Sequence, residues 1–258
     1  MLFPIGDDNR DRRITPFINY ILIALNIFVF VYYQSLGTNQ EFIYAYSMVP
    51  AEIITGKDIV TDDRVYEDKL TGEKFNVPGL QPTPIPVLFT FFTSMFMHAS
   101  IAHIFGNMLF LLIFGDNLEN RIGHLRYLIF YLVTGLCAGL SQVFITLNFG
   151  GDAFIPTLGA SGAISGVLGG YLMLFPTRRV RVMIFYIITE VPALVALGLW
   201  FVFQLFSGFS SLGNAQGGVA FAAHIGGFVS GFLLIRLFAI GTKKWPPQVR
   251  KGFFTFVI

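Results

Sequence analysis

The feature that most constrains this chain is a series of long apolar segments separated by short clusters of charge. These segments cover approximately residues 14–36, 99–118, 127–148, 160–175, 183–207 and 218–240. A helix needs about 20 apolar residues to span the roughly 30 Å hydrocarbon core of a bilayer, and most of the segments approach that length. We therefore expect six transmembrane helices in an all-α membrane protein that folds as one bundle.

The composition excludes an ordinary soluble domain. Hydrophobic residues make up 54% of the chain and charged residues only 12%, against about 25% charged in a typical soluble domain. So small a chain cannot bury 30 Phe residues, and lipid must cover much of its surface. A net charge of +2 gives no basis for nucleic-acid binding. The single cysteine, Cys137, excludes a disulfide framework and a Cys-based metal site, and we expect it to pack as a small hydrophobe.

The distribution of Lys and Arg predicts the orientation of the bundle. With the N-terminus inside, the inner segments contain 13 of these residues and the outer loops contain four, Lys57, Arg64, Lys69 and Lys74. Cytoplasmic loops of membrane proteins carry an excess of basic residues. We therefore expect both termini in the cytoplasm, with a short segment over 1–13, a six-span domain over 14–240 and a tail over 241–258.

One long connection interrupts this compact pattern. The outer loop over residues 37–86 carries eight acidic residues against its four basic ones. Its stretch 65–75 predicts a small β-hairpin with a turn near Gly72. The prolines at 78, 82, 84 and 86 stiffen the return of the chain to the membrane.

Few polar side chains that could carry chemistry fall in or beside the apolar segments, where ionisable groups are costly and are candidates for function. They are His98, His103, Asn107, Ser161, Ser165, Glu190 and His224. We expect Glu190 at the inner interface, without a chemical role. The chain has no HExxH zinc-protease motif and no phosphate-binding P-loop. Asp116 and Asp152 fall at a helix end and in a loop, so they do not form the aspartate pair of an acid protease.

The fourth apolar segment is too short to cross the bilayer. From Ser161 to Phe175 it has 15 residues, about 22 Å of helix, so its start should lie about 8 Å below the outer surface. The sequence Gly159-Ala160-Ser161-Gly162 places a serine at this recessed helix start. Free backbone N–H groups there can face a developing oxyanion, as acyl transfer requires.

Two histidines are expected at the same depth as this serine. Counted from the inner ends of their helices at about 1.5 Å per residue, His103 and His224 both lie within a few Å of the level of Ser161. Stripes of small residues can bring the fourth and sixth helices together. These stripes are Gly162, Gly166 and Gly170 on the fourth helix, and Ala223, Gly227 and Gly231 on the sixth.

Close contact of the two stripes would place the Ser161 hydroxyl near the His224 imidazole, as a nucleophile and its general base. On the second helix, His103 and Asn107 are four residues apart and share a face. Both side chains can donate hydrogen bonds toward a carbonyl oxygen near Ser161.

These residues together resemble the rhomboid family of intramembrane serine proteases. The matching motifs occur in the family's order over about residues 87–240, and the first span matches by position only. They are His98 with His103 and Asn107; Glu119-Asn120-Arg121-Ile122-Gly123; Gly159-Ala160-Ser161-Gly162; and Ala223-His224-Ile225-Gly226-Gly227 with Gly231.

The resemblance implies a six-helix rhomboid bundle that cleaves transmembrane protein substrates in the lipid bilayer with a Ser161–His224 dyad and no acid. It implies no cofactor and no metal, and it leaves the oligomeric state open. Carried over residue by residue, His103, Asn107 and the Ser161 N–H are the oxyanion donors. We expect an integral multi-pass protein of a bacterial inner membrane. Residues that would support the site are His98, Glu119, Gly159, Gly162, Gly227 and Gly231.

Two positions depart from the family pattern. The Trp-Arg pair common before the second span is Phe89-Thr90 here, which removes the arginine contacts that brace the outer loop. The aromatic residue that commonly follows the nucleophile by four positions and stacks on the histidine is Ser165 here. We expect Ser165 either to orient His224 through a hydrogen bond or merely to keep the helix surface small.

Other interpretations remain open. A serine in an apolar helix often only bonds its own backbone, and a His–Asn pair can simply hold two helices together. A rhomboid-like pseudoprotease would bind membrane proteins without cutting them, but such a protein is expected to lack Ser161 or His224. A transporter should show mid-span charges and broken helices in both halves, and this sequence shows one short helix without a counterpart.

Overall fold

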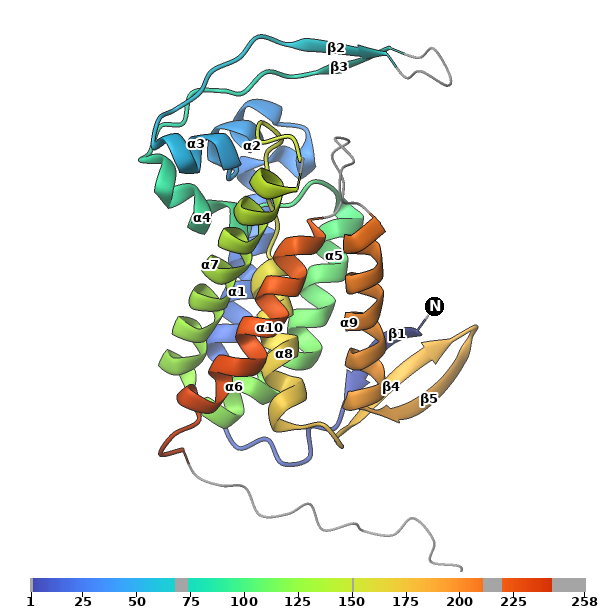
Figure 1. Ribbon diagram of the computed structural model, residues 1–258. Helices are drawn as coiled ribbons and strands as arrows, with labels where there is room; N and C mark the ends of the chain where they lie inside the picture. The colour runs from blue at the N-terminus through green and yellow to red at the C-terminus, as the bar shows by residue number, and fades with distance from the viewer. Residues whose placement is uncertain (1, 68–73, 150, 211–219, 243–258) are drawn as a thin grey trace, which may run out of the picture.

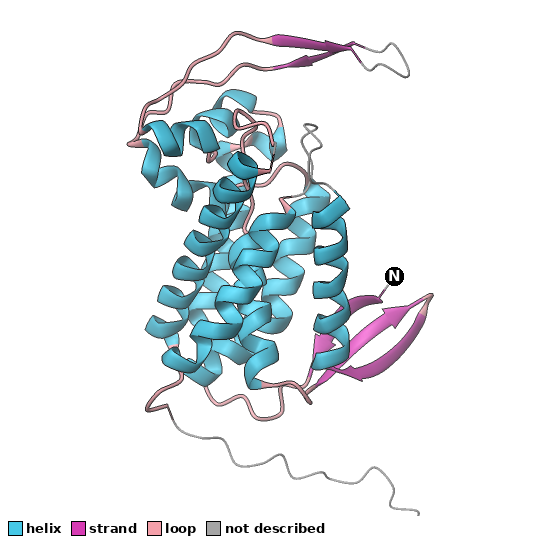
Figure 2. Ribbon diagram, viewed as in Figure 1, coloured by secondary structure: helices cyan, strands magenta, loops and turns pink. Residues whose placement is uncertain are grey.

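The computed structural model describes residues 2–67, 74–149, 151–210 and 220–242 as a mostly helical bundle with small β-sheets at its edges (Figures 1 and 2). Four helical segments are long and apolar enough to cross a membrane: Ile101–Ile122, His124–Asn148, Ala193–Ser210 and Phe221–Phe238. Shorter apolar helical segments are Phe17–Tyr33, Val87–Phe96 and Ser161–Leu174. The expected total of six spans stays a prediction.

The bundle helices follow the order of the apolar segments. The first comprises α1 (Phe17–Phe28) and the π-helical turn η1 (Val29–Tyr33). The second comprises α5 (Ile101–Phe110), the π-helical turn η5 (Leu111–Gly115) and α6 (Asp116–Ile122). The remaining bundle helices are α7 (His124–Asn148), α8 (Ser161–Leu174), α9 (Ala193–Ser210) and α10 (Phe221–Phe238).

Helix α8 is the centre of the bundle. It has 14 residues, of which 11 are buried, as expected of a helix that is apolar all round and enclosed by others. The predicted stripes of small residues do meet. A Cβ atom on Gly227 would overlap the carbonyl oxygen of Gly162, and one on Gly231 would overlap that of Gly166. The backbones of α8 and α10 are therefore in direct contact, which confirms the predicted packing.

The long connection between the first two bundle segments folds as short elements above the bundle in Figure 1. Its helices are η2 (Ser35–Gly37), α2 (Gln40–Tyr46), α3 (Pro50–Thr55), η3 (Val87–Phe89), α4 (Thr90–Thr93) and η4 (Ser94–Phe96). Strands β2 (Arg64–Glu67) and β3 (Lys74–Val77) pair antiparallel, which confirms the predicted hairpin. Its expected turn near Gly72 lies outside the described residues.

The prediction of a helix over residues 183–207 was wrong in its first ten residues. Strands β4 (Arg179–Ile184) and β5 (Ile187–Pro192) form a hairpin there, and α9 begins only at Ala193. Buried Val180 and Val182 alternate with exposed Arg179 and Arg181, which is the two-residue period of a strand. The hairpin is largely apolar, like the helix that follows it, so hydropathy alone assigned both to one segment.

The N-terminal segment over 1–13 also contains an unpredicted strand. Strand β1 (Leu2–Asp7) pairs antiparallel with β4 and completes a three-stranded sheet in the order β1-β4-β5. The protein is therefore helical with two small sheets rather than all-α. Pairing between residues nearly 180 positions apart leaves no local signal in the sequence.

Polar residues tie this sheet to the lower ends of the helices in Figure 1, and we call this region the charged end. The Arg178 guanidinium donates to Asp11 Oδ2 at 2.6 Å and to the Asn117 side-chain oxygen. Asp7 Oδ2 accepts from Asn117 Nδ2 at 2.7 Å and from the Tyr171 hydroxyl at 2.6 Å. Burial raises the pKa of the Asp7 carboxyl to about 6, against the lowering effect of these hydrogen bonds and of Arg178.

Candidate active site

Ser161 and His224 are in direct contact. Ser161 is the first residue of α8, and His224 lies in the first turn of α10. The Ser161 Oγ and His224 Nε2 atoms are 2.8 Å apart, a hydrogen-bonding distance. The glycine contacts between α8 and α10 fix this juxtaposition, because they hold the two helix starts side by side.

The other nitrogen of His224 is bonded by a residue that sequence reasoning missed. The Gln204 side-chain oxygen, on α9, lies 2.8 Å from His224 Nδ1. A carbonyl oxygen only accepts, so Nδ1 must carry the proton in this bond. Nε2 then keeps its lone pair and accepts from the Ser161 hydroxyl, which is the tautomer that a general base requires. A buried polar residue within an apolar segment is the signal that could have identified Gln204.

The Ser165 hydroxyl bonds its own helix and not His224, which favours the alternative that Ser165 only keeps the helix surface small. The Ser165 hydroxyl donates to the Ser161 carbonyl oxygen at 2.6 Å, one turn back along its own helix. Back-bonding of this kind is common for a serine inside a helix. Aromatic rings do flank the His224 ring, but they come from α9 and from α10 itself rather than from α8. The Trp200 centroid lies at 6.2 Å with its ring tilted, and the Phe221 centroid lies at 6.3 Å in an edge arrangement.

His103 lies close to Ser161 in the same cavity. The Ala99 N–H donates to His103 Nδ1 at 3.4 Å, so the second nitrogen, Nε2, carries the proton and can donate. A Cβ atom built on Gly159 would lie 3.2 Å from His103 Nε2 and 3.4 Å from Ser161 Oγ. Gly159 also has a φ of +130°, which a side chain rarely adopts. A glycine is therefore needed here, both for the backbone conformation and for the close approach of His103.

Asn107 lines the same cavity as Ser161, His103 and His224. Within the described part of the chain, its Nδ2 atom is buried and has no hydrogen-bond partner. Leaving a buried donor unsatisfied costs about 1–3 kcal/mol, so such groups are rare and call for an explanation. The arrangement offers this donor to a group that enters the cavity.

His98 supports the loop before α5 rather than the cavity. Its ring is fully buried and lies 5.1 Å from the His103 ring, centroid to centroid. Its backbone N–H and carbonyl are both bonded by the Gln34 side chain at 2.9 Å. Gln34 was not singled out from the sequence. Its two bonds brace a loop that lacks the arginine contacts expected at Phe89-Thr90.

Glu119 lies at the charged end, away from the cavity. Its carboxylate accepts from the Ile18 and Asn19 N–H groups at 3.0 and 2.7 Å, and thereby caps the first turn of α1. His124 Nδ1 lies 2.5 Å from the same carboxylate. Glu190 is exposed on β5, where it lies 3.9 Å from Arg181. Neither acid touches Ser161 or His224.

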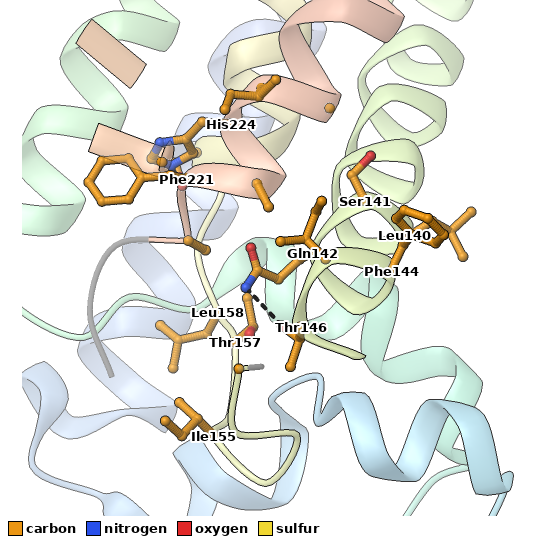
Figure 3. A pocket seen from close by; sticks show the side chains of 18 of the residues that line it. Leu140, Ser141, Gln142, Phe144, Thr146, Ile155, Thr157, Leu158, Phe221 and His224 are labelled. Carbon is orange, nitrogen blue, oxygen red and sulfur yellow. Dashed lines mark hydrogen bonds between the residues drawn. The ribbon is translucent and has the colours of Figure 1, made fainter. Parts of the chain in front are cut away.

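The cavity above Ser161 is large enough for an extended peptide segment, with a volume of about 1290 Å³. Figure 3 shows Gln142 and Thr146 of α7, Thr157 and Leu158 of the loop before α8, and His224 of α10 around it. The Gln142 side chain donates to Thr146 Oγ1 at 3.3 Å and accepts from the Ala223 N–H at 3.3 Å. The walls are otherwise largely apolar, as in typical ligand pockets.

The long apolar helices and this partly buried hydroxyl–imidazole pair define a polytopic membrane protein with a serine-type candidate site. The rhomboid domain model matches residues 86–240, more than half of the chain. The chain therefore belongs to the rhomboid family.

Individual relatives agree with this assignment. The chain is 31% identical over 142 residues to Rhomboid protein 1, mitochondrial, of Saccharomyces cerevisiae, covering 54% of this chain and 39% of that protein. It is 32% identical over 146 residues to RHOMBOID-like protein 4 of Arabidopsis thaliana, covering 54% and 31%. It is 30% identical over 152 residues to Rhomboid protease GluP of Bacillus subtilis, covering 59% and 26%. The matches thus span well under half the length of these relatives.

Proposed function

We propose that this protein is an intramembrane serine protease in which Ser161 is the nucleophile and His224 the general base. The observation that carries the proposal is the 2.8 Å hydrogen bond between Ser161 Oγ and His224 Nε2 inside a cavity. A nucleophile and base within hydrogen-bond reach, with the base oriented by a third group, is the pattern of covalent catalysis. The similarity to a relative named as a protease supports the same activity.

In the proposed reaction, His224 Nε2 takes the hydroxyl proton as Ser161 Oγ attacks the scissile carbonyl carbon. Collapse of the tetrahedral intermediate breaks the C–N bond, and His224 returns the proton to the leaving amine. Water then attacks the acyl ester, again losing its proton to His224, and releases Ser161 and the carboxylic acid product. Gln204 keeps His224 in the reactive tautomer through both half-reactions.

The oxyanion of this intermediate would be stabilised by three donors. They are His103 Nε2–H, Asn107 Nδ2 and the Ser161 backbone N–H at the start of α8. The unpartnered Asn107 donor fits this role, because such a group gains its hydrogen bond only when substrate is present. A pre-aligned donor of this kind contributes about 2.7–4 kcal/mol to the transition state.

The remaining predicted site residues have supporting roles in this proposal. Gly159 lets His103 approach Ser161, while Gly162, Gly227 and Gly231 let α8 and α10 touch. The bonds of Glu119 hold α1 against the second bundle segment. His98 packs against His103 and keeps that ring in place.

The proposed substrates are transmembrane segments of membrane proteins that enter the cavity from the bilayer. We place both termini in the cytoplasm of a bacterial cell, with the protein in the inner membrane and Ser161 recessed below the outer surface. Accessibility of single cysteines to a membrane-impermeant reagent, introduced near the N-terminus and in the 37–86 loop, tests this orientation. Modification of the N-terminal cysteine from outside would contradict it.

Cleavage of a model transmembrane substrate by purified protein in vesicles tests the proposed activity. We expect cleavage by the wild type and none by Ser161→Ala or His224→Ala at equal amounts of folded protein. Members of a catalytic pair act as a unit, so loss of either removes nearly all turnover. Cleavage that survives Ser161→Ala would overturn the assignment. Binding of the substrate by wild type without cleavage would indicate a pseudoprotease.

A further inference from the structure

The tip of the β4–β5 hairpin is an exposed apolar surface next to the bundle. Phe185 and Tyr186 are 79% and 96% exposed, and Ile187 and Ile188 are 69% and 61% exposed. The six residues over 183–188 carry no charge. Isolated exposed apolar residues are normal in proteins, but a contiguous cluster marks an interaction surface.

The turn of this hairpin holds two aromatic residues in a strained backbone conformation. Ile184 pairs with Ile187, so Phe185 and Tyr186 are the central residues of a two-residue turn. Their φ angles are +44° and +69°, in the left-handed region. Such turns favour Asn-Gly or similar pairs, because bulky side chains are strained there. A strained backbone at a surface turn suggests that the two aromatic side chains are kept for a function.

The root of the hairpin is fixed at the charged end. Its inward residues Val180 and Val182 are fully buried, and its neighbour β1 packs against η5, midway along the second bundle segment. Asp7 of β1 pairs with Val180 of β4 and accepts a hydrogen bond from the Asn117 side chain. Asn117 lies five residues before the end of α6, which is about 7.5 Å along the helix axis. The root therefore lies within the length of the bundle and not beyond its end.

From that root the hairpin rises beside α9, as Figure 1 shows. The side of α9 that faces away from the bundle is apolar, with Leu199 and Phe203 each 57% exposed. In a membrane protein this face meets lipid. The apolar tip of the hairpin projects from the same side of the bundle.

We propose that the β4–β5 hairpin is an interfacial anchor whose tip enters the headgroup–acyl boundary of the leaflet at the charged end. The occupant of the surface is lipid. Among the described residues, β5 has no strand partner on its outer edge, and unpaired backbone groups do not occur in the hydrocarbon core. The boundary supplies water and headgroups to these groups and apolar chains to the tip. Tyrosine is enriched at this depth.

Charge along the hairpin fits the same placement. Arg179 and Arg181 are exposed near its root, on the face opposite Val180 and Val182. Arginines next to an apolar tip can reach lipid phosphates while their stems cover apolar surface. The gradient from a charged root to an apolar tip follows the gradient from headgroup to acyl chain.

Fluorescence quenching in vesicles tests the anchor without any need for proteolytic activity. In a Cys137→Ala background, Tyr186→Cys and Glu190→Cys are labelled with a polarity-sensitive fluorophore and reconstituted into phosphatidylcholine–phosphatidylglycerol vesicles. We expect the label at 186 to be blue-shifted, quenched by brominated lipid and protected from aqueous iodide. The label at 190, at the charged root, is the matched control and should be quenched more strongly by iodide.

A second variant separates the aromatic side chains from the hairpin itself. Phe185→Asn with Tyr186→Gly supplies residues that the turn prefers, so the hairpin should form at least as well in detergent. A label at Ile188→Cys should then lose its quenching by brominated lipid, because the tip no longer holds the strand at the boundary. Retained lipid quenching in this variant would overturn the role of the aromatic pair.

Two results would overturn the anchor as a whole. Quenching of the label at 186 by iodide and not by lipid would place the tip in water. Protection from both quenchers that disappears when the protein is diluted in the vesicles would mean that a second copy of the chain covers the tip.

Discussion

The two ends of the helical bundle use buried polar groups in different ways. At the charged end, Arg178 and Asp11 form an ion pair that neighbouring side chains complete with further bonds. At the site end, around Ser161, the groups are uncharged, and the buried Nδ2 atom of Asn107 has no partner among the described residues. Asp7 Oδ1 and Asp11 Oδ1 at the charged end also have no partner among the described residues, so the two ends differ in kind: open acceptors beside an ion pair at one end, and an open donor in a cavity at the other. We therefore expect the ion pair and hydrogen bonds of the charged end to stabilise the fold, and the open donor at the site end to be available to a ligand.

This contrast predicts that substitutions at the two ends separate stability from turnover. The largest loss of stability is expected for Arg178→Met, which leaves Asp11 and Asn117 without their buried donor. Removing one partner of a fully buried ion pair costs about 3–5 kcal/mol, and because the Asp11 side chain is 25% exposed we expect a loss near the lower end of that range. Thermal unfolding in detergent measures it, and turnover per folded molecule should be unchanged. An unaltered Tm would show that the charged end does not stabilise the fold.

The matching substitution at the site end is Asn107→Ala, which removes one proposed oxyanion donor. Turnover should fall by about 10²–10³, or 2.7–4 kcal/mol, while the Tm stays the same or rises. A rise is possible because the substitution removes a buried donor that has no partner in the fold. His103→Ala should slow turnover in the same way. Full turnover by either variant would exclude that residue from the site.

The pH dependence of stability probes the charged end separately. The Asp7 pKa rises from its ordinary value of 3.8 to about 6 on folding because the carboxyl is buried. The folded state thus holds a proton that the unfolded state has lost, so stability falls as the pH rises from about 4 to 6. The loss approaches 3 kcal/mol at about 1.4 kcal/mol per pKa unit. Asp7→Asn, which resembles the protonated form, should lose the Asp7 part of this decline in thermal unfolding, and a decline identical to that of wild type would contradict the prediction.

A smaller effect is expected at Gln204, a positioning residue that acts through His224. Gln204→Leu cannot accept from Nδ1–H, and kcat should fall by tenfold or more, about 1.4 kcal/mol, with little change in KM. Gln204→Glu keeps the acceptor and should restore turnover. Its charge favours the protonated imidazole and should move the acid limb of the pH–rate profile to higher pH. Equal activity of Gln204→Leu and wild type would show that Gln204 does not position His224.

The smallest effect is expected at Ser165, whose hydroxyl bonds only its own helix. Ser165→Ala should leave turnover within about twofold of wild type, since a neutral back-bond contributes little. A tenfold loss would show that the hydroxyl acts on His224 after all.

The sequence predicted the close contact of Ser161 with His224 because two local patterns determine it. A helix start at Ser161 and a repeat of small residues on α8 and α10 leave one way for the helices to touch. Gln204 could not be placed in the same way. Helix α9 is apolar on most of its surface, so the sequence pattern does not specify which side faces α10. The sequence left two roles open for Ser165, because it does not show that the hydroxyl bonds a carbonyl of its own helix.

The sheet at the charged end was missed for a different physical reason. Hydropathy measures apolar content and not periodicity, so the apolar strands over 179–192 resembled the start of the next helix. The partner strand β1 lies at the other end of the chain, and long-range pairing leaves no mark in local sequence. The hairpin β2–β3, whose two strands are close in sequence, was predicted.

The central claim is that Ser161 is an activated nucleophile. A serine-directed fluorophosphonate probe tests it directly, because the probe forms a covalent bond only with a serine that a neighbouring base deprotonates. We expect stable labelling of wild type at Ser161, strong reduction in His224→Ala and none in Ser161→Ala, at equal amounts of folded protein. Labelling of Ser161→Ala at the wild-type level, or no labelling of folded wild type, would contradict the claim.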